Sequence, residues 1–279
     1  MPTMQKITIR DIQKFKDAGT SFATVTAYDY MSARNADIVE IPLLLVGDSA
    51  AMVVYGMDTT IPISMEELIF LVRAVRRGSD NALVVADMPF MSYQASVEDA
   101  VRNAGRFVKE GGAEAIKLEG GSVYAAQIKA IIDAGIPVMG HVGLLPQSYH
   151  LSSGYRIQGK TKLEAKKILA DAMAVQDSGA FSVVLEGIPS NLADKITQKL
   201  DIPTIGIGAG PYCDGQIQVY HDILGLYGEM IPRHCKRYGN LGRQIQEMIM
   251  EYKGDVETKK FPTQEHYTTS QSLSAENLK

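Results

Sequence analysis

The chain has 279 residues, of which 46% are hydrophobic and 22% charged, a composition typical of a globular protein with a sizeable core. Its formal net charge of −4 and its lack of long basic clusters argue against a nucleic-acid-binding surface. No apolar run reaches the roughly 18 residues of a membrane span, and Lys6 and Arg10 interrupt any N-terminal signal peptide. Cys213 and Cys235 form neither a zinc motif nor a disulfide framework, so we expect a cytoplasmic protein.

Short apolar runs recur along the chain, each followed by a turn and then by an amphipathic segment. In chain order, the predicted strands are residues 22–28, 43–47, 82–86, 115–118, 138–142, 182–185 and 204–207. Most of these runs are apolar on both faces, which is typical of strands in a parallel sheet that helices cover on the outside. The pattern therefore favours an α/β fold.

The segments between the strands carry the signals of helix ends. Three serine or threonine residues each stand three positions before an acidic residue, as N-terminal caps do: Ser64 before Glu67, Ser96 before Asp99, and Thr161 before Glu164. Glycines that can end a helix follow at Gly78, Gly111, Gly135 and Gly179.

Seven such strands, with an eighth expected near residues 226–230, favour a closed (β/α)8 TIM barrel over an open doubly wound sheet. We expect a first helix at 9–18 to close the bottom of the barrel and a last helix at 241–252 to cover its side. Residues 1–262 are assigned to one catalytic barrel domain. From 263 to 279 the composition turns polar, which predicts a loose C-terminal tail.

Polar residues stand where several of the apolar runs end, which is where the reacting groups of a TIM barrel lie. They are Asp48 and Ser49, Asp87, Lys117 and Glu119, His141, and Glu186. Four carboxylates at one barrel mouth would repel each other unless a cation shared the site, so a hard divalent metal such as magnesium is predicted. Taken singly, Asp48 and Asp87 are also typical of helix or turn caps.

Lys117 and Glu119 are two positions apart and therefore lie on the same face of their strand. An outward orientation would bury two charges under helices, so we expect both to point into the barrel. A purely structural ion pair remains the alternative. Glu186 directly follows an apolar run, and burial there would raise its pKa toward the range that suits a general base.

Two further features are ambiguous in the sequence. His141 is compatible with a base, an orienting residue or a satisfied core histidine, and the core interpretation is slightly favoured. The loop 206–210 permits close approach to an anion, but Pro211 stands in the place of the last glycine of a dinucleotide motif, which argues against nicotinamide binding.

From about residue 8 to residue 266 the chain resembles the ketopantoate hydroxymethyltransferase family. The strings that carry the resemblance are Thr26-Ala27-Tyr28-Asp29, Leu45-Val46-Gly47-Asp48-Ser49, Asp58-Thr59-Thr60, Ala86-Asp87-Met88-Pro89-Phe90-Met91, Lys117-Leu118-Glu119-Gly120-Gly121, His141-Val142-Gly143-Leu144, Pro146-Gln147-Ser148 and Gly206 to Gly210. The resemblance implies a phosphoenolpyruvate/pyruvate-type barrel with bound Mg2+. It also implies transfer of a one-carbon unit from 5,10-methylenetetrahydrofolate to 3-methyl-2-oxobutanoate, giving 2-dehydropantoate for pantothenate synthesis.

The resemblance also implies roles for individual residues and an assembly. Carried over by position, these are Asp48, Asp87 and Glu119 for the metal, Asp48, Ser49, Asp87 and Lys117 for the keto acid, and Glu186 as the proton acceptor. Family members are typically homodecamers of two stacked pentamers, so a homo-oligomer is expected. The chain departs from the family pattern at Ala50-Ala51 and at 150–153, which puts loop packing in doubt more than activity.

Two other functions are compatible with the same barrel. One is a lyase or aldolase that acts on a magnesium-bound 2-oxo acid and would need no folate. The other is a barrel without catalysis that serves in binding or assembly, since fold does not guarantee function. That second alternative predicts damaged metal ligands, whereas Asp48, Asp87, Glu119 and Glu186 are all intact.

Overall fold

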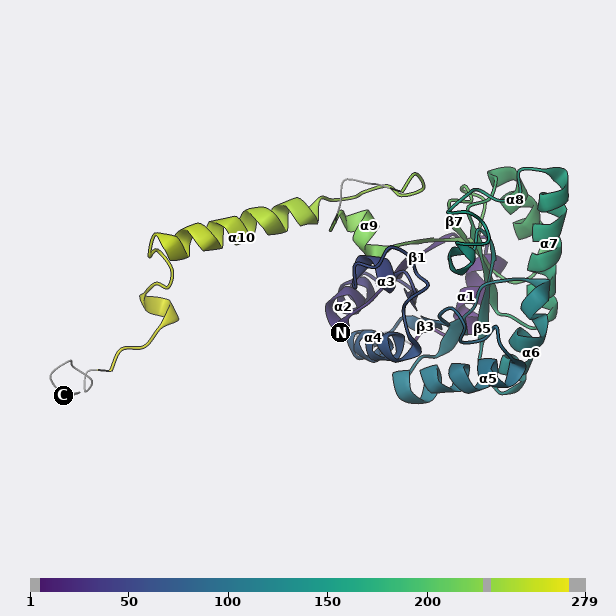
Figure 1. The fold of residues 1–279 in the computed structure, drawn as a ribbon, viewed down its shortest axis with the longest axis horizontal. Helices are drawn as coiled ribbons and strands as arrows, with labels where there is room; N and C mark the ends of the chain where they lie inside the picture. Colours follow the sequence, from purple (N-terminus) through teal and green to yellow (C-terminus); the bar gives the residue numbers. More distant parts are fainter. Residues whose placement is uncertain (1–5, 228–231, 271–279) are drawn as a thin grey trace.

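The computed structural model describes residues 6–227 and 232–270, and within them eight parallel strands close into one barrel (Figure 1). The strands are β1 (Phe22–Thr26), β2 (Leu43–Val46), β3 (Leu83–Asp87), β4 (Ala115–Lys117), β5 (Val138–Gly143), β6 (Ser182–Glu186), β7 (Thr204–Ile207) and β8 (Gly215–Gln218). Each strand pairs with the next in sequence, and β8 pairs with β1 to close the ring. The predicted TIM barrel is confirmed.

Most of the described helices surround the barrel on its outside (Figure 1). In chain order, the helices are α1 (Ile9–Asp17), α2 (Tyr30–Ile38), α3 (Ala50–Val53), α4 (Met65–Gly78), α5 (Val97–Arg106), α6 (Ala125–Asp133), α7 (Lys162–Asp177), α8 (Ser190–Lys199), α9 (Tyr220–Leu224) and α10 (Leu241–Glu257), with a π-helical turn at Phe107–Gly111 and 3-10 turns at Ser122–Tyr124, Pro146–Ser148 and Gln264–His266. The predicted caps form, because Ser64, Ser96 and Thr161 each accept a backbone N–H three residues on.

Alternate strand residues fill the interior of the barrel with apolar side chains. They belong to one buried cluster of Phe22, Leu43, Leu45, Leu83, Val85, Ala115, Met139, Val184, Ile205, Ile207 and Ile217. Ile12 of α1 is fully buried in the same cluster, so the first helix closes the bottom of the barrel as expected. The intervening strand residues, such as Leu44 and Val84, pack outward against the helices in a second buried cluster.

The position predicted for the eighth strand was wrong. β8 is Gly215–Gln218, while Leu226 and Tyr227 are outside any strand and residues 228–230 lie outside the described part of the chain. Only the inward side chain of β8, Ile217, is apolar and buried, whereas Gln216 and Gln218 are partly exposed. The strand is therefore not apolar on both faces, and this is why the apolar-run criterion missed it.

The last helix does not cover the side of its own barrel, contrary to expectation. Figure 1 shows α10 extending away from the barrel, and none of its residues is buried. Backbone hydrogen bonds from Tyr238 N to Ile223 O (2.7 Å) and from Gly242 N to Gly225 O (2.9 Å) hold the start of α10 against α9. Among the residues that the structure describes, no helix is both long and apolar enough to cross a membrane.

Candidate active site

The site residues continue the inward-facing rows of the strands at the carboxyl end of the barrel. Asp87 stands two positions after Val85, Lys117 two after Ala115, His141 two after Met139, and Glu186 two after Val184. Because side chains alternate along a strand, each of these polar groups points into the barrel above an apolar layer. The parity predicted for Lys117 and Glu119 is therefore confirmed, since both are inside and buried.

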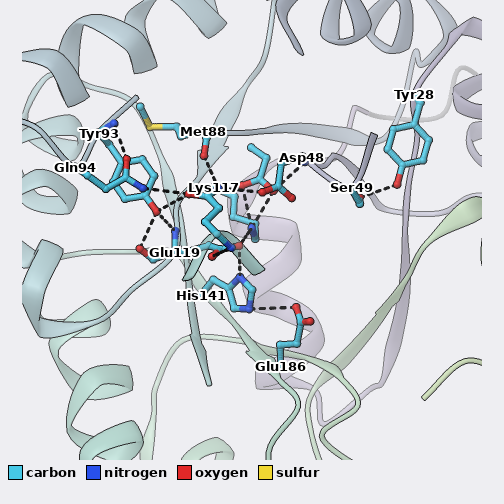
Figure 2. Close-up of polar contacts among 12 residues, drawn as sticks. Tyr28, Asp48, Ser49, Met88, Tyr93, Gln94, Lys117, Glu119, His141 and Glu186 are labelled. Carbon is cyan, nitrogen blue, oxygen red and sulfur yellow. Dashed lines mark hydrogen bonds and ion pairs between the residues drawn. The ribbon is translucent and has the colours of Figure 1, made fainter. Parts of the chain in front are cut away.

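Lys117 lies among the carboxylates of neighbouring strands (Figure 2). Its Nζ is 2.9 Å from Oδ1 and 2.9 Å from Oδ2 of Asp87, and 4.0 Å from Oε1 of Glu119. The three side chains are almost fully buried. Removal of either partner would leave an uncompensated buried charge, so the arrangement depends on all three groups being present.

Asp48 and Ser49 enter the site from the end of β2. The backbone N–H of Asp48 donates to Oδ2 of Asp87 at 3.3 Å, so strands β2 and β3 are joined at this carboxylate. Ser49 Oγ lies 2.8 Å from the hydroxyl of Tyr28, which is itself buried after β1. Tyr28 thus holds the serine hydroxyl in place, a role that the sequence did not indicate.

Burial and like charges shift the titration of the carboxylates upward. Desolvation raises the pKa of Asp48 to about 7, with a further increase from the negative charge of Asp87. Desolvation also raises the pKa of Glu119 well above its usual value, although Lys117 opposes it. Burial alone would lower the pKa of Lys117, but Asp87 and Glu119 raise it overall, so the lysine stays charged. One ammonium does not compensate this many acids, and additional positive charge would be favourable here.

Glu186 and His141 form the other half of the site (Figure 2). Desolvation raises the pKa of Glu186 to about 7, while the charges of Lys117 and His234 lower it in part. His141 Nε2 is 3.3 Å from Oε2 of Glu186, and its Nδ1 is 3.6 Å from Oε1 of Glu119. The buried histidine therefore lies between two acids of the site, and its role as a base, an orienting residue or a core histidine stays a prediction.

Gln147 is a site residue that residue patterns did not reveal. It belongs to the 3-10 turn Pro146–Ser148 after β5, where no strand or helix periodicity applies. Its Nε2 donates to Oδ2 of Asp48 at 3.0 Å, and its backbone N–H donates to Oε2 of Glu119 at 3.0 Å. The string Pro146-Gln147-Ser148 was noted only as a part of the family resemblance, which was the one available signal.

The metal site and the loop 206–210 were both considered from the sequence. No three His, Cys, Asp or Glu side chains among the described residues are arranged as a ready metal site. Lys117 donates to both oxygens of Asp87. Gly208 and Gly210 of loop 206–210 line a different hollow of about 440 Å³, together with Ser21, Gln216, Gln218 and His234. None of the predicted site residues lines that hollow.

Solved structures of a phosphonopyruvate hydrolase and of a 2,3-dimethylmalate lyase have the same architecture. A phosphonopyruvate hydrolase complex with oxalate and Mg++ superposes with a TM-score of 0.61 at 12% identity, covering 98% of this chain and 93% of that one. A 2,3-dimethylmalate lyase of the PEP mutase/isocitrate lyase superfamily superposes with a TM-score of 0.59 at 17% identity, covering 98% and 90%. At these identities the likeness shows the fold alone.

Proteins of similar sequence identify the family, which the structural likeness alone does not. A 3-methyl-2-oxobutanoate hydroxymethyltransferase of Carboxydothermus hydrogenoformans is 52% identical over 266 residues, covering 95% of this chain and 96% of the relative. The protein of the same name from Geobacter metallireducens is 52% identical over 262 residues, covering 94% and 98%. The family profile described as ketopantoate hydroxymethyltransferase matches residues 6–264. The chain therefore belongs to the ketopantoate hydroxymethyltransferase family.

Proposed function

We propose that the protein transfers a hydroxymethyl unit from 5,10-methylenetetrahydrofolate to 3-methyl-2-oxobutanoate, which gives 2-dehydropantoate for pantothenate synthesis. The observation that carries the proposal is the family match over residues 6–264, joined to an intact set of inward acids and a lysine at the barrel mouth. The name that the two relatives share supplies the keto acid and the transferred group. The folate donor comes from the family resemblance.

The residues present fit a hard divalent cation, for which we propose Mg2+. Asp48, Asp87 and Glu119 would hold it through carboxylate oxygens, the donors that Mg2+ prefers. Oε1 of Glu119 is buried and has no hydrogen-bond partner, so a buried acceptor is left open toward the site. When bound, the ion would polarise the keto oxygen of the substrate and neutralise negative charge that develops on it.

The chain's own groups divide the remaining tasks. Lys117 is a fixed buried cation, which suits the carboxylate of a 2-oxo acid or an oxygen on which negative charge grows. Ser49, held by Tyr28, would donate a hydrogen bond to the substrate, and Asp48 and Asp87 would border it. Glu186 would remove the C3 proton, because its raised pKa and partial exposure suit a general base that reacts with a substrate near neutral pH.

A lyase or aldolase acting on the same kind of acid remains the second candidate. A solved 2,3-dimethylmalate lyase has the same fold at 17% identity, which shows the fold alone and does not decide between the two reactions. Such an enzyme would use the same acids and would not depend on folate. A barrel without catalysis is less well supported, because Asp48, Asp87, Glu119 and Glu186 are all retained.

We further propose that the protein is a homo-oligomer, a homodecamer by resemblance to the family. The support from this chain is an uncovered apolar stripe on α10, formed by Ile245, Met248, Ile249, Tyr252 and Val256, all of which are exposed. These positions recur at helical spacing and so lie on one face. The two unpaired cysteines are in keeping with the proposed reducing cytoplasm.

The experiment that tests the reaction is an assay of 2-dehydropantoate from both substrates, with Mg2+ and again with a chelator. We expect product only when keto acid, folate donor and metal are all present. Cleavage of a branched 2-oxo-acid adduct without folate would favour the lyase, and absence of any turnover with all components would favour the non-catalytic barrel.

A further inference from the structure

The turn after β5 carries a residue, Gln147, that makes several polar contacts with the site. Gln147 lies on the 3-10 turn Pro146–Ser148 and is only 4% exposed. The turn brings it across the barrel mouth, because it contacts Asp48 after β2 and Glu119 after β4 at the same time. A residue from one loop thus joins carboxylates from two other strands.

The orientation of the Gln147 amide is fixed by its partners. Nε2 donates to the backbone carbonyl of Met88 at 2.9 Å and to Oδ2 of Asp48 at 3.0 Å. On the other side, Oε1 lies 3.1 Å from the hydroxyl of Tyr93 and accepts from Nε2 of Gln94 at 3.1 Å. A carbonyl oxygen can only accept, so the nitrogen must face Met88 and Asp48. The amide has no remaining freedom to rotate.

The backbone of the same residue constrains the second carboxylate. The N–H of Gln147 donates to Oε2 of Glu119 at 3.0 Å, which occupies one oxygen of that group. The other oxygen, Oε1, is buried without a hydrogen-bond partner, 3.6 Å from Nδ1 of His141 and 4.0 Å from Nζ of Lys117. The contact therefore leaves Oε1 of Glu119 as the oxygen that is free to bind a ligand in the site.

We propose that Gln147 is a positioning residue that fixes the Asp48 and Glu119 carboxylates for the divalent cation, so that metal affinity depends on its side-chain amide. The inference rests on the metal site proposed above. Hydrogen bonds from neutral donors hold a carboxylate in one rotation and favour its charged form. Groups that orient metal ligands in this way typically contribute about 10–100-fold to metal affinity.

The test uses Gln147→Met, which keeps the length of the side chain and the backbone N–H but removes the amide. The matched control is Gln158→Met, from the same loop, whose Nε2 donates to the backbone carbonyl of Arg156 and, among the described residues, to no group of the site. Binding of Mn2+ alone is measured by electron paramagnetic resonance, without keto acid or folate. We expect Gln147→Met to bind Mn2+ about 10–100-fold more weakly, and Gln158→Met to bind like the wild type.

Kinetic and thermal-unfolding measurements on Gln147→Met show whether Gln147 positions metal ligands or only stabilises the fold. For Gln147→Met we expect the metal concentration for half-maximal rate to rise by the same factor, while kcat at saturating metal falls much less. Unfolding temperatures of both methionine variants are measured without metal. If Gln147→Met does not fold, Gln94→Met removes one contact that fixes the amide and should weaken Mn2+ binding by a smaller factor in the same direction.

The outcomes distinguish this inference from the proposed function. If the wild type binds Mn2+ and Gln147→Met, or Gln94→Met in its place, binds it equally well, the positioning role is wrong and the metal site stands. If the wild type and Gln158→Met bind no Mn2+, the metal site itself is wrong and the role of Gln147 is overturned with it. Weaker binding by Gln147→Met alone supports both.

Discussion

At the scale of single residues, the buried ion pair between Lys117 and Asp87 determines what a substitution at the site does to stability. The ammonium bonds both oxygens of Asp87 at 2.9 Å, and its next acid, Glu119, is 4.0 Å away. Substitution of one partner therefore leaves a buried charge without compensation, which costs about 3–5 kcal/mol. A substitution of Lys117 or Asp87 would therefore lower both activity and stability.

We predict that Asp87→Asn lowers the free energy of unfolding by about 3–5 kcal/mol and abolishes metal-dependent turnover. Denaturant unfolding and product assays measure the two effects. Asp80→Asn is the matched control, because Asp80 pairs with Arg34 on the surface at 3.1 Å and should contribute less than about 1 kcal/mol. Equal losses in the two variants would show that the Lys117–Asp87 pair is not buried in solution.

The raised pKa of Glu186 predicts how activity depends on pH. A general base works as the carboxylate, so kcat/KM should rise about tenfold per pH unit below 7 and level off above it. The charge of His234 lowers the pKa of Glu186, and His234→Gln should therefore move the inflection to higher pH. A profile that is flat between pH 5 and pH 8, or a shift to lower pH in the variant, would contradict this assignment.

The sequence predicted the charged residues of the site and missed their uncharged partners. Asp87, Lys117, Glu119 and Glu186 could be found because charge at the end of an apolar run is conspicuous and strand parity gives its direction. Gln147 sits in a loop, where no periodicity says which way a side chain points. Its contacts depend on tertiary packing that local sequence does not encode.

At the scale of elements, α1 contributes to the barrel as a plug rather than as an outer helix. Ile12 is fully buried among inward strand residues at the bottom, on the side opposite to the reacting groups. We predict that Ile12→Ala lowers the free energy of unfolding by about 2–5 kcal/mol while kcat at moderate temperature stays close to that of the wild type.

Denaturant unfolding of Ile12→Ala and of Leu163→Ala checks this prediction. Leu163 lies on α7 and is 81% exposed, so its truncation should change stability little. A stability loss as small for Ile12→Ala as for Leu163→Ala would mean that the helix does not close the barrel in solution.

Seven of the strands could be read from the sequence because helices cover them, which makes both faces apolar. β8 differs, since Gln216 and Gln218 face outward beside a hollow that no helix of the described chain fills. The prediction therefore moved the eighth strand to a more apolar segment further along the chain. The outer face of β8 is not covered by a described helix, because α10 extends away from the barrel. Both the misplaced eighth strand and the misplaced last helix follow from this.

At the scale of the whole molecule, α10 exposes Ile245, Met248, Ile249, Tyr252 and Val256. Of these, Tyr252 has a ring contact with Phe261, just after the helix. An exposed apolar stripe of this kind marks an interaction surface. The hydrogen bond from Gly242 to Gly225 holds the start of the helix in its outward direction. A second copy of the chain is thus a more suitable partner than the barrel from which the helix extends.

We predict that Ile249→Glu dissociates the assembly, because it places a charge in the middle of the apolar stripe. Light scattering after size-exclusion chromatography measures the mass, which should be a multiple of 30.4 kDa for the wild type and smaller for the variant. Glu247→Lys changes a charge on the opposite face of α10, where Glu247 is exposed beside Arg243, and should leave the mass unchanged. A wild type of 30.4 kDa would contradict the proposed homo-oligomer.

We propose that Glu186 removes the C3 proton of a 2-oxo acid held among the inward acids and Lys117. The most direct test follows deuterium entering C3 of 3-methyl-2-oxobutanoate in D2O with Mg2+, for the wild type and for Glu186→Gln. Exchange by the wild type, with keto-acid binding kept but exchange reduced about 10²–10⁴-fold in Glu186→Gln, is the predicted result. Equal exchange by the two proteins would show that another group is the base.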